Sequence, residues 1–293
     1  MKRVLIIGKT SYAGRAIVAR LSLSPGEYGV EAVSISDLAL NNCSFAPFDV
    51  IVLVTGLVQQ AKELDNLFAS LNRGFAIEIA KKAKGEGVSK LILMSTMDVY
   101  GAGRMFRKTY EIGPDSRLKP GSPYGKTRLE TETGVEALSD DSFKVCIIRA
   151  PMVYGEACDG NYRLLRRYVL RFGFIPDYNN NQSAIYIGNL CEYVRVLIDE
   201  DMSGVFCPRD IESFNTAAVM EWIARENARE YVKSGFLGAC IKPASVLFYF
   251  LREVFGNLTY DPLLSRIPLN EYNKWNLRDA IHKTEEGFKS MRR

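Results

Sequence analysis

Short, largely apolar runs alternate with helical patterns through the first 150 residues, and this alternation limits the folds open to the chain. The runs have four to six residues, a length that is typical of strands buried on both faces of a parallel sheet. Two helical patterns lie between them, at Gly14–Leu21 and Phe75–Lys84. The pattern predicts an α/β fold with a doubly wound parallel sheet. The runs are Val4–Ile7, Val30–Ile35, Val50–Val54, Leu91–Met94 and Val145–Ile148.

The second half of the chain has a different texture. A polar loop covers Asp177–Gln182, and a helical pattern covers Phe214–Arg229. Apolar runs near 184–187 and 204–207 predict two strands that return to the first sheet. We therefore expect one domain over residues 1–155, completed by those two strands, and a smaller C-terminal lobe over residues 156–293.

Composition excludes several classes of protein. The formal net charge is only +4, with 38 Lys and Arg against 34 Asp and Glu, which is too weak to predict nucleic-acid binding. Six cysteines occur without a C-x-x-C pair, and His282 is the single histidine. A zinc site would need such residues in clusters, so we expect no metal. His282 itself is expected at the surface without a partner.

The sequence also predicts a cytoplasmic protein. The apolar part of the segment after Met1 is too short for a signal peptide, and no run approaches the roughly 20 apolar residues of a membrane span. Val246–Leu251 is the most apolar segment, and Arg252 and Glu253 follow it. We expect a buried helix of the second lobe here, with a contact at a membrane surface as the alternative.

A glycine-containing turn follows the first predicted strand. Gly8 and Gly14 occupy the outer positions of a G-x-x-G-x-x-G pattern, and Ser11 stands in the middle. Between a strand and a helix, such a turn brings a pyrophosphate onto the helix N-terminus. This context predicts dinucleotide binding in a Rossmann-type sheet. The residues expected to contact the cofactor here are Gly8, Thr10, Ser11, Tyr12 and Gly14.

The end of the second strand leaves the choice between NAD and NADP open. Dinucleotide-binding folds usually carry an acid there for the adenosine ribose. The expected position is Ser34, with Asp37 three residues further on. Without a carboxylate at this place a 2′-phosphate is tolerated, and Lys9 or Arg15 is then a candidate partner for it.

Two further motifs follow in the order expected for one family. S-T-M-D-V-Y-G covers residues 95–101, and S-P-Y-G-K-T-R covers residues 122–128. The chain resembles an extended short-chain dehydrogenase/reductase of the NAD-dependent epimerase/dehydratase family, whose motifs read S-S-x-x-V-Y-G and Y-G-x-S-K. Asn72 matches the asparagine of its N-x-x-G-T motif, and R-A-P-M-V-Y-G at residues 149–155 resembles a later segment. The likeness covers nearly the whole chain and implies an oxidoreductase or isomerase that binds NAD or NADP.

The resemblance assigns roles to three residues. Tyr124 is expected to be the acid/base and Thr96 to hydrogen-bond the reacting oxygen. A tyrosine acts as a base only beside a cation that lowers its pKa, and a side chain four residues later on a helix lies on the same face. The family has lysine there, to hold the nicotinamide ribose, whereas this chain has Arg128. Arginine keeps the charge but is bulkier and forked.

The resemblance also implies a nucleotide-sugar substrate. Asn161 and Arg163 lie in a Gly-Asn-Tyr-Arg segment similar to that of surface-polysaccharide sugar enzymes, and Gln182 stands where the family has an arginine. These three residues are the expected substrate contacts. We expect neither a nucleic-acid partner nor a membrane span, and a homodimer is possible from the sequence.

Three functions remain in view. The first is a nucleotide-sugar 4-epimerase of surface-polysaccharide precursor synthesis. The second is an NADPH-dependent UDP-4-keto-6-deoxy-sugar 4-reductase. The third is a dinucleotide-binding regulator of low activity, suggested by Arg128 and Gln182.

Overall fold

A computed structural model describes the chain except residues 39, 41, 55–64, 102–105, 107–109 and 292–293, and except the side chains of residues 65–73 and 249. The chain divides into two compact units. Unit 1 consists of residues 1–101, 117–150 and 191–208. Unit 2 consists of residues 102–116, 151–190 and 209–293.

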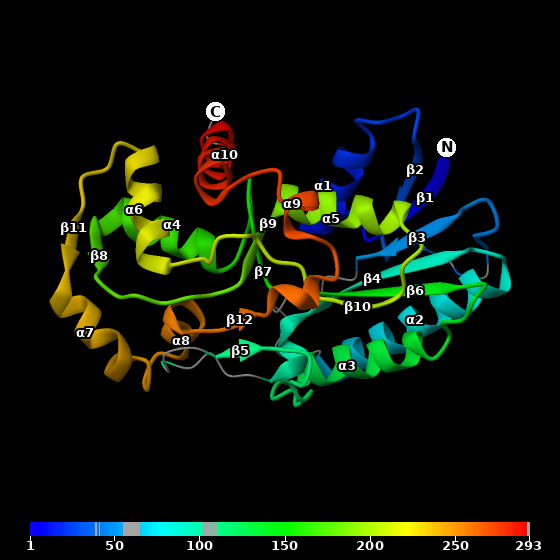
Figure 1. Ribbon diagram of the computed structural model, residues 1–293, viewed down its shortest axis with the longest axis horizontal. Coiled ribbons are helices and arrows are strands. Elements are labelled where there is room, and N and C mark those ends of the chain that lie inside the picture. The colour runs from blue at the N-terminus through cyan, green and yellow to red at the C-terminus, as the bar shows by residue number, and fades with distance from the viewer. Residues whose placement is uncertain (39, 41, 55–64, 102–105, 107–109, 292–293) are drawn as a thin grey trace. The chain divides into compact units, whose positions relative to one another are not determined.

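Unit 1 is built on a six-stranded parallel sheet in the order β10-β6-β4-β3-β1-β2 (Figure 1). The middle parts of the central strands are apolar, as expected for strands that are covered by helices on both faces. The order reverses direction next to β1, which is where ligands bind in doubly wound sheets. The strands are β1 (Lys2–Ile7), β2 (Tyr28–Val33), β3 (Val50–Leu53), β4 (Lys90–Thr96), β6 (Lys144–Ala150) and β10 (Gly204–Phe206).

Helices cover both faces of this sheet. Figure 1 shows α2 and α3 on one face and α1 and α5 on the other. On the first face, Ala76, Ile79 and Ala80 of α2 belong to the same buried cluster as Ile51 and Leu93 of the sheet. The helices are α1 (Tyr12–Leu21), α2 (Asp65–Gly85), α3 (Pro123–Glu136) and α5 (Ile187–Asp199), of which the part from Cys191 onward belongs to unit 1. The six parallel strands confirm the predicted fold class.

Unit 2 combines short parallel strand pairs with a layer of helices. The pairs are β7 with β9, β8 with β11, and β5 with β12. The strands are β5 (Glu111–Ile112), β7 (Met152–Tyr154), β8 (Phe174–Pro176), β9 (Ala184–Tyr186), β11 (Val232–Ser234) and β12 (Thr259–Tyr260). The helices are α4 (Asn161–Phe172), α6 (Thr216–Glu226), α7 (Gly235–Ala244), α8 (Tyr249–Phe255), α9 (Leu269–Tyr272) and α10 (Leu277–Ser290).

The structure departs from the expected domain layout at three strands: β5 and β7, which lie within residues 1–155, belong to unit 2, and so does β9. β10 lies in the large sheet, where the apolar run near 204–207 places it. β9, from the run near 184–187, instead pairs with β7 in unit 2. The apolar run predicts a buried strand but does not indicate which strand it pairs with. In the structure that partner is β7, which begins immediately after Pro151.

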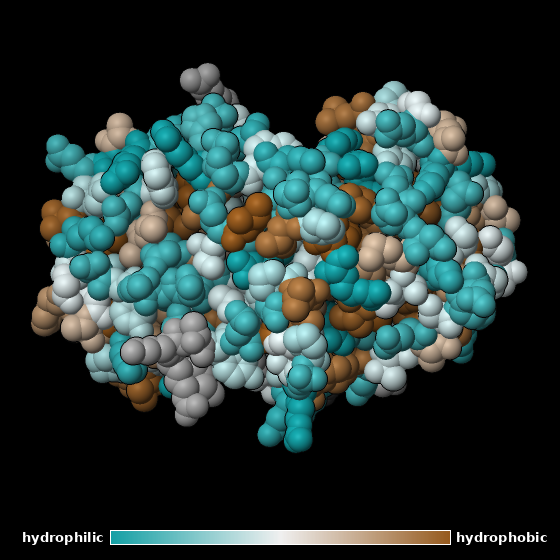
Figure 2. All heavy atoms as spheres, viewed as in Figure 1, coloured by the Kyte–Doolittle hydropathy of each residue, from teal (hydrophilic) through white to brown (hydrophobic). Residues whose placement is uncertain are grey.

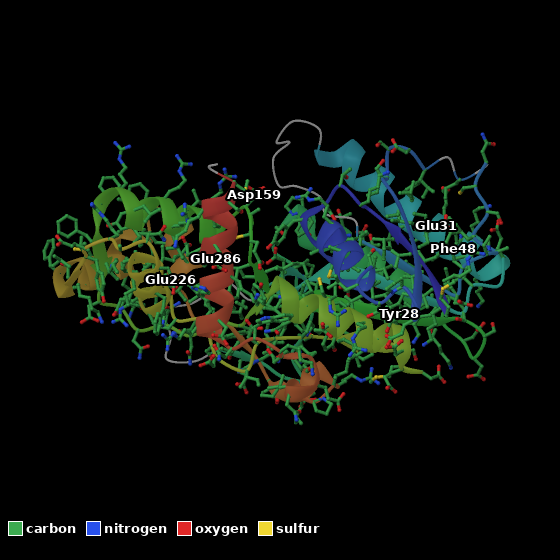
Figure 3. All side chains as sticks on the ribbon, turned by 90° about the horizontal axis from the view of Figure 1, so that it is seen from above. Tyr28, Glu31, Phe48, Asp159, Glu226 and Glu286 are labelled. Atoms are coloured by element: carbon green, nitrogen blue, oxygen red, sulfur yellow. The ribbon has the colours of Figure 1, made fainter. Side chains whose placement is uncertain are left out.

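Two local expectations in unit 2 were wrong. The Val246–Leu251 segment is not a buried helix: Val246, Leu247 and Phe248 form the turn before α8, and their exposed fractions are 74%, 82% and 62%. His282 on α10 does have partners, since its Nδ1 lies 2.8 Å from Glu226 and its Nε2 lies 3.4 Å from Glu286. Figure 3 labels both carboxylates, on α6 and α10.

No helix in the part of the chain that the structure describes is long and apolar enough to cross a membrane.

Candidate active site

The turn between β1 and α1 has the close backbone approaches that its glycines predict. Gly8 has φ +108°, and a Cβ atom on it would lie 2.2 Å from the carbonyl oxygen of Val54. A Cβ atom on Gly14 would lie 2.2 Å from the carbonyl oxygen of Gly8. Neither position has room for a side chain, because contacts this short do not occur between real atoms.

Ser11 takes the middle position of the turn as an N-cap. Its backbone is extended, with φ −72°, so the left-handed conformation that favours glycine is not needed here. Its hydroxyl donates to the Gly8 carbonyl at 2.8 Å and accepts from the Gly14 N–H at 3.0 Å. The serine thereby fixes the start of α1 and links both glycines.

The N-terminus of α1 fits a pyrophosphate. Its first turn contains no acidic residue, so its N–H groups and the positive end of the helix dipole favour an anion. Thr10 is exposed and Tyr12 is half-buried at this end. Arg15 donates to the Thr10 carbonyl at 2.6 Å and holds the turn from the helix side. The start of α1, beside the tight turn that Gly8 and Gly14 allow, is therefore suited to the pyrophosphate of a dinucleotide.

The end of β2 places a buried serine beside an exposed acid. Ser34 is buried, and its hydroxyl lies 3.0 Å from that of Ser36. Hydrogen bonds from Ser34 and Ser36 hold the pKa of Asp37 below its usual range. The N–H groups of Gly8 and Lys9 donate to Val33 at 2.8 and 3.1 Å, so the end of β2 adjoins the glycine turn. Asp37 thus lies on the segment that follows β2, next to the glycine turn.

Tyr124 and Arg128 lie one turn apart on α3 and are in contact. The Nε of Arg128 donates to the Tyr124 hydroxyl oxygen at 3.4 Å, and its guanidinium carbon lies 5.6 Å from the centre of the Tyr124 ring. Arg128 is buried, whereas Tyr124 is half-buried. Ser122 starts the helix by accepting the N–H of Gly125 at 2.9 Å, with Pro123 in the first turn.

Gly125 brings the start of α3 against the end of β4. A Cβ atom on Gly125 would lie 2.8 Å from the carbonyl oxygen of Asp98, in the 3-10 turn Met97–Tyr100 that follows β4. Thr96 is the N-cap of this turn and accepts the Asp98 N–H at 3.2 Å. The glycine after Tyr124 therefore allows the helix that carries Tyr124 and the turn capped by Thr96 to pack closely.

A buried polar network supports this region, and sequence reasoning missed it. The Nε and one terminal nitrogen of Arg149 donate to Glu132 at 3.0 and 2.8 Å. The other terminal nitrogen donates to the Tyr100 hydroxyl at 2.9 Å, and Ser95 donates to Glu132. Burial raises the pKa of Tyr100 to about 12. The network joins α3, β4 and β6. The sequence feature that could have indicated it is the charged Arg149, directly after the apolar run that ends at Ile148.

The expected substrate contacts all belong to unit 2. Asn161 is the first residue of α4, and Arg163 is exposed and paired with Asp159 at 2.5 Å. Gln182 is buried, and its amide nitrogen donates to the backbone carbonyls of Glu253, Val254 and Gly256 at 2.8–3.0 Å. Its substrate contact stays a prediction, and the amide already has a structural role.

Asn72 lies within α2, which begins at Asp65 rather than at Phe75, and its side chain is outside the described residues. Among the residues that the structure describes, no cluster of His, Cys, Asp and Glu could hold a metal ion.

The chain is similar to known proteins along most of its length. The sequence profile of the NAD dependent epimerase/dehydratase family matches residues 4–173. A UDP-glucose 4-epimerase of Vibrio cholerae is 26% identical over 250 residues, which cover 76% of this chain and 75% of that protein.

Solved structures share the fold. A UDP-glucuronic acid 4-epimerase from Bacillus cereus in complex with NAD superposes with a TM-score of 0.76 at 16% identity, covering 99% of this chain and 100% of that one. A UDP-glucose 4-epimerase from Thermotoga maritima in complex with UDP-glucose superposes with a TM-score of 0.69 at 15% identity, with the same coverage.

Proposed function

The chain belongs to the NAD dependent epimerase/dehydratase family, and from this premise we propose that it is a nucleotide-sugar 4-epimerase that acts in the synthesis of surface-polysaccharide precursors. The observation that carries the proposal is the contact between the Tyr124 hydroxyl and Arg128 at 3.4 Å, on a helix that packs against the turn capped by Thr96. The similarity to the Vibrio cholerae epimerase supports the same reaction.

The residues of unit 1 are suited to hold a dinucleotide. The Gly8–Gly14 turn and the N-terminus of α1 would take the pyrophosphate, the end of β2 the adenosine ribose, and Arg128 the nicotinamide ribose. When bound, NAD(P) supplies the acceptor and donor of the hydride that moves from and to C4 of the sugar.

Tyr124 moves the proton in this proposal. Its hydroxyl oxygen takes the proton of the sugar 4-hydroxyl as C4 is oxidised, and returns it once the keto sugar has turned its other face. The Arg128 guanidinium stabilises the negative charge that the phenol oxygen carries without its proton. Thr96 donates its hydroxyl hydrogen to the reacting sugar oxygen and so orients it.

Incubation with UDP-glucose or UDP-N-acetylglucosamine tests the proposal. The expected result is slow conversion to the 4-epimer without net consumption of NADH or NADPH, measured by chromatography of the nucleotide sugars. Failure with both sugars, together with failure on their uronic-acid counterparts, contradicts the 4-epimerase.

A UDP-4-keto-6-deoxy-sugar reductase is the second candidate, and Ser34 favours it. Ser34 stands at the position where an acid is usual, with Asp37 three residues further on, and a serine at this position tolerates the 2′-phosphate of NADPH. Stoichiometric consumption of NADPH with a UDP-4-keto-6-deoxy sugar would identify the reductase. Dinucleotide binding without turnover on either class of sugar would identify a regulator.

A further inference from the structure

Unit 2 contains an apolar pocket that the proposed reaction does not use. Its volume is about 460 Å³, within the roughly 300–1,000 Å³ of small-molecule sites. It lies between α7 and α8 on one side and α4, α6 and β8 on the other. Among its described lining residues there is no charged side chain. A nucleotide diphosphate needs cations, so this pocket is not suited to a nucleotide sugar.

The pocket follows from the way α7 lies against its unit. A Cβ atom on Gly238 would lie 2.2 Å from the carbonyl oxygen of Asp177, so the glycine lets α7 lie directly on the chain after β8. Leu237, Ile241 and Ala244 recur at helical spacing along α7 and line the pocket. Leu251 of α8 and Leu165 of α4 line it from other sides.

Exposed apolar side chains adjoin the pocket. Val246, Leu247 and Phe248 are consecutive in the turn that joins its two helical walls, and all three are more than 60% exposed. Phe236, at the start of α7, is 77% exposed. Figure 2 shows hydrophobic side chains on the surface at the turn between α7 and α8. Single exposed apolar residues such as Phe236 are common, but three consecutive ones next to the walls of an apolar pocket mark an interaction site.

The charges from α7 to the middle of α8 have one sign, and the carboxylate of the neighbouring Asp177 is paired with Lys233 at 3.5 Å. Between Gly235 and Arg252 the sequence contains the cations Lys242 and Arg252 and no acidic residue. Both cations are exposed, and they flank the apolar turn on its two sides. The next acid along the chain, Glu253, is half-buried. Apolar side chains between cations complement a surface that is anionic outside and apolar below, which is the interface of a negatively charged lipid bilayer.

We propose that unit 2 docks on an anionic lipid bilayer through the 246–248 turn, with the pocket between α7 and α8 receiving an acyl chain. The three exposed side chains enter the interface, and Lys242 and Arg252 lie at the level of the phosphate groups. This is a peripheral contact of one face. It goes beyond the proposed reaction, and its test measures binding rather than turnover.

Co-flotation of the full chain with lipid vesicles tests the contact. We expect binding to vesicles of phosphatidylcholine with phosphatidylglycerol, and much weaker binding to phosphatidylcholine alone. Leu247→Asp should lower the partition coefficient at least about tenfold, which is the effect of losing the burial of one leucine. Lys242→Gln and Arg252→Gln should each lower it about fivefold on the anionic vesicles. Leu23→Asp is the matched control, since Leu23 in unit 1 is 75% exposed.

Two free thiols report on the pocket itself. Cys240 lines the pocket, Cys43 lies in unit 1, and both are half-buried. Anionic vesicles should slow the reaction of Cys240 with N-ethylmaleimide and leave the rate at Cys43 unchanged, as measured by mass spectrometry of the peptides. Vesicle binding without protection of Cys240 would overturn the acyl-chain site.

Other results overturn the bilayer contact. They are no binding to anionic vesicles, or equal binding of wild type, Leu247→Asp and Leu23→Asp. A dimer that forms with rising concentration, is broken by Leu247→Asp and leaves vesicles unbound would show that a second copy of the chain covers this surface. Light scattering of the same variants measures that outcome.

Discussion

Arg128 changes how a cation can assist the tyrosine on α3. A lysine ammonium is a compact charge on a flexible chain, whereas a guanidinium is planar and donates in fixed directions. In this structure the guanidinium is buried, and its Nε points to the Tyr124 oxygen. The contact with Tyr124 therefore uses one N–H donor of the Arg128 guanidinium, and its other N–H donors can hydrogen-bond neighbouring groups.

Variants at position 128 separate charge from shape. Arg128→Met should lower kcat about 10²–10⁴-fold, the usual range for acid–base assistance, because no cation then faces the Tyr124 oxygen. Arg128→Lys should recover most of that loss. Steady-state kinetics with the epimerase substrate, beside dinucleotide binding by calorimetry, measures both effects. Wild-type kcat in Arg128→Met would show that the cation has no part in the reaction.

Tyr124→Phe tests the proton transfer more directly. It should abolish turnover and leave dinucleotide affinity nearly unchanged, because only the hydroxyl is removed while the ring stays against Arg128. Tyr110→Phe, at an exposed tyrosine of unit 2, is the control and should keep full activity. Equal loss of turnover and affinity in Tyr124→Phe would mean that the phenol serves the fold rather than the reaction.

The contact between Tyr124 and Arg128 could be predicted from the sequence because it is local. Two residues four apart on a helix meet wherever the helix lies. The partners of Glu132 and Arg149 depend instead on how α3, β4 and β6 pack, and spacing along the chain does not give them. The exposed position of Leu247 has the same origin. An apolar run predicts burial, whereas the 246–248 turn of this run is exposed.

At the scale of the elements, the ion pair of Glu132 and Arg149 joins helix α3 to strand β6. Both side chains are almost fully buried, and hydrogen bonds to Glu132 raise the pKa of Arg149 against the opposing effect of burial. Removing one partner of a buried pair leaves the other charge uncompensated. The pair thus holds α3 in a fixed register on the sheet and, with it, the position of Tyr124.

Glu132→Gln should therefore destabilise unit 1 by about 3–5 kcal/mol, the usual cost of breaking a buried ion pair from one side. Urea unfolding followed by circular dichroism measures this cost. Glu136→Gln is the matched control at an exposed position of the same helix, and it should change stability by less than about 0.5 kcal/mol. A loss below about 1 kcal/mol in Glu132→Gln would show that the packing of α3 does not depend on the pair.

The turn between β1 and α1 allows a second prediction at the scale of the elements, on dinucleotide binding and stability. Gly8→Ala forces a side chain into the space held by the Val54 carbonyl and strains a backbone with φ +108°. We expect loss of dinucleotide binding and destabilisation of at least about 1–3 kcal/mol. Gly26→Ala is the control, since a Cβ atom there meets nothing within 4 Å. Dinucleotide binding by Gly8→Ala with wild-type affinity would rule out the predicted pyrophosphate site at this turn.

At the scale of the whole molecule, the two units can be followed separately. The chain has two tryptophans, Trp222 and Trp275, and both belong to unit 2. Tryptophan fluorescence therefore reports on unit 2, whereas circular dichroism reports on both units. Proteins with more than one compact unit often unfold in more than one step. Comparing the fluorescence and circular dichroism signals therefore distinguishes unfolding of unit 2 from unfolding of unit 1.

Unit 2 contains a buried acid that makes its stability depend on pH. Burial raises the pKa of Asp210 to about 7, against the lowering effect of hydrogen bonds from Asn189, the Tyr186 N–H and Tyr154. Glu212 also raises it. The folded state therefore keeps a proton that the unfolded state has released above about pH 4. The stability of unit 2 should fall as pH rises from about 4 to 7 and level off above that.

Comparison of wild type with Asp210→Asn isolates this contribution. Between pH 5 and pH 8 the wild type should lose on the order of 2 kcal/mol that Asp210→Asn does not lose, because an amide has no proton to release. Urea unfolding followed by tryptophan fluorescence measures the difference. His282 acts in the same direction, since its hydrogen bond to Glu226 raises the pKa of the imidazole and the resulting stability is lost as pH rises. His282→Gln should therefore keep the part of the slope that belongs to Asp210. If wild type and Asp210→Asn show the same slope, the carboxyl of Asp210 does not titrate in this range.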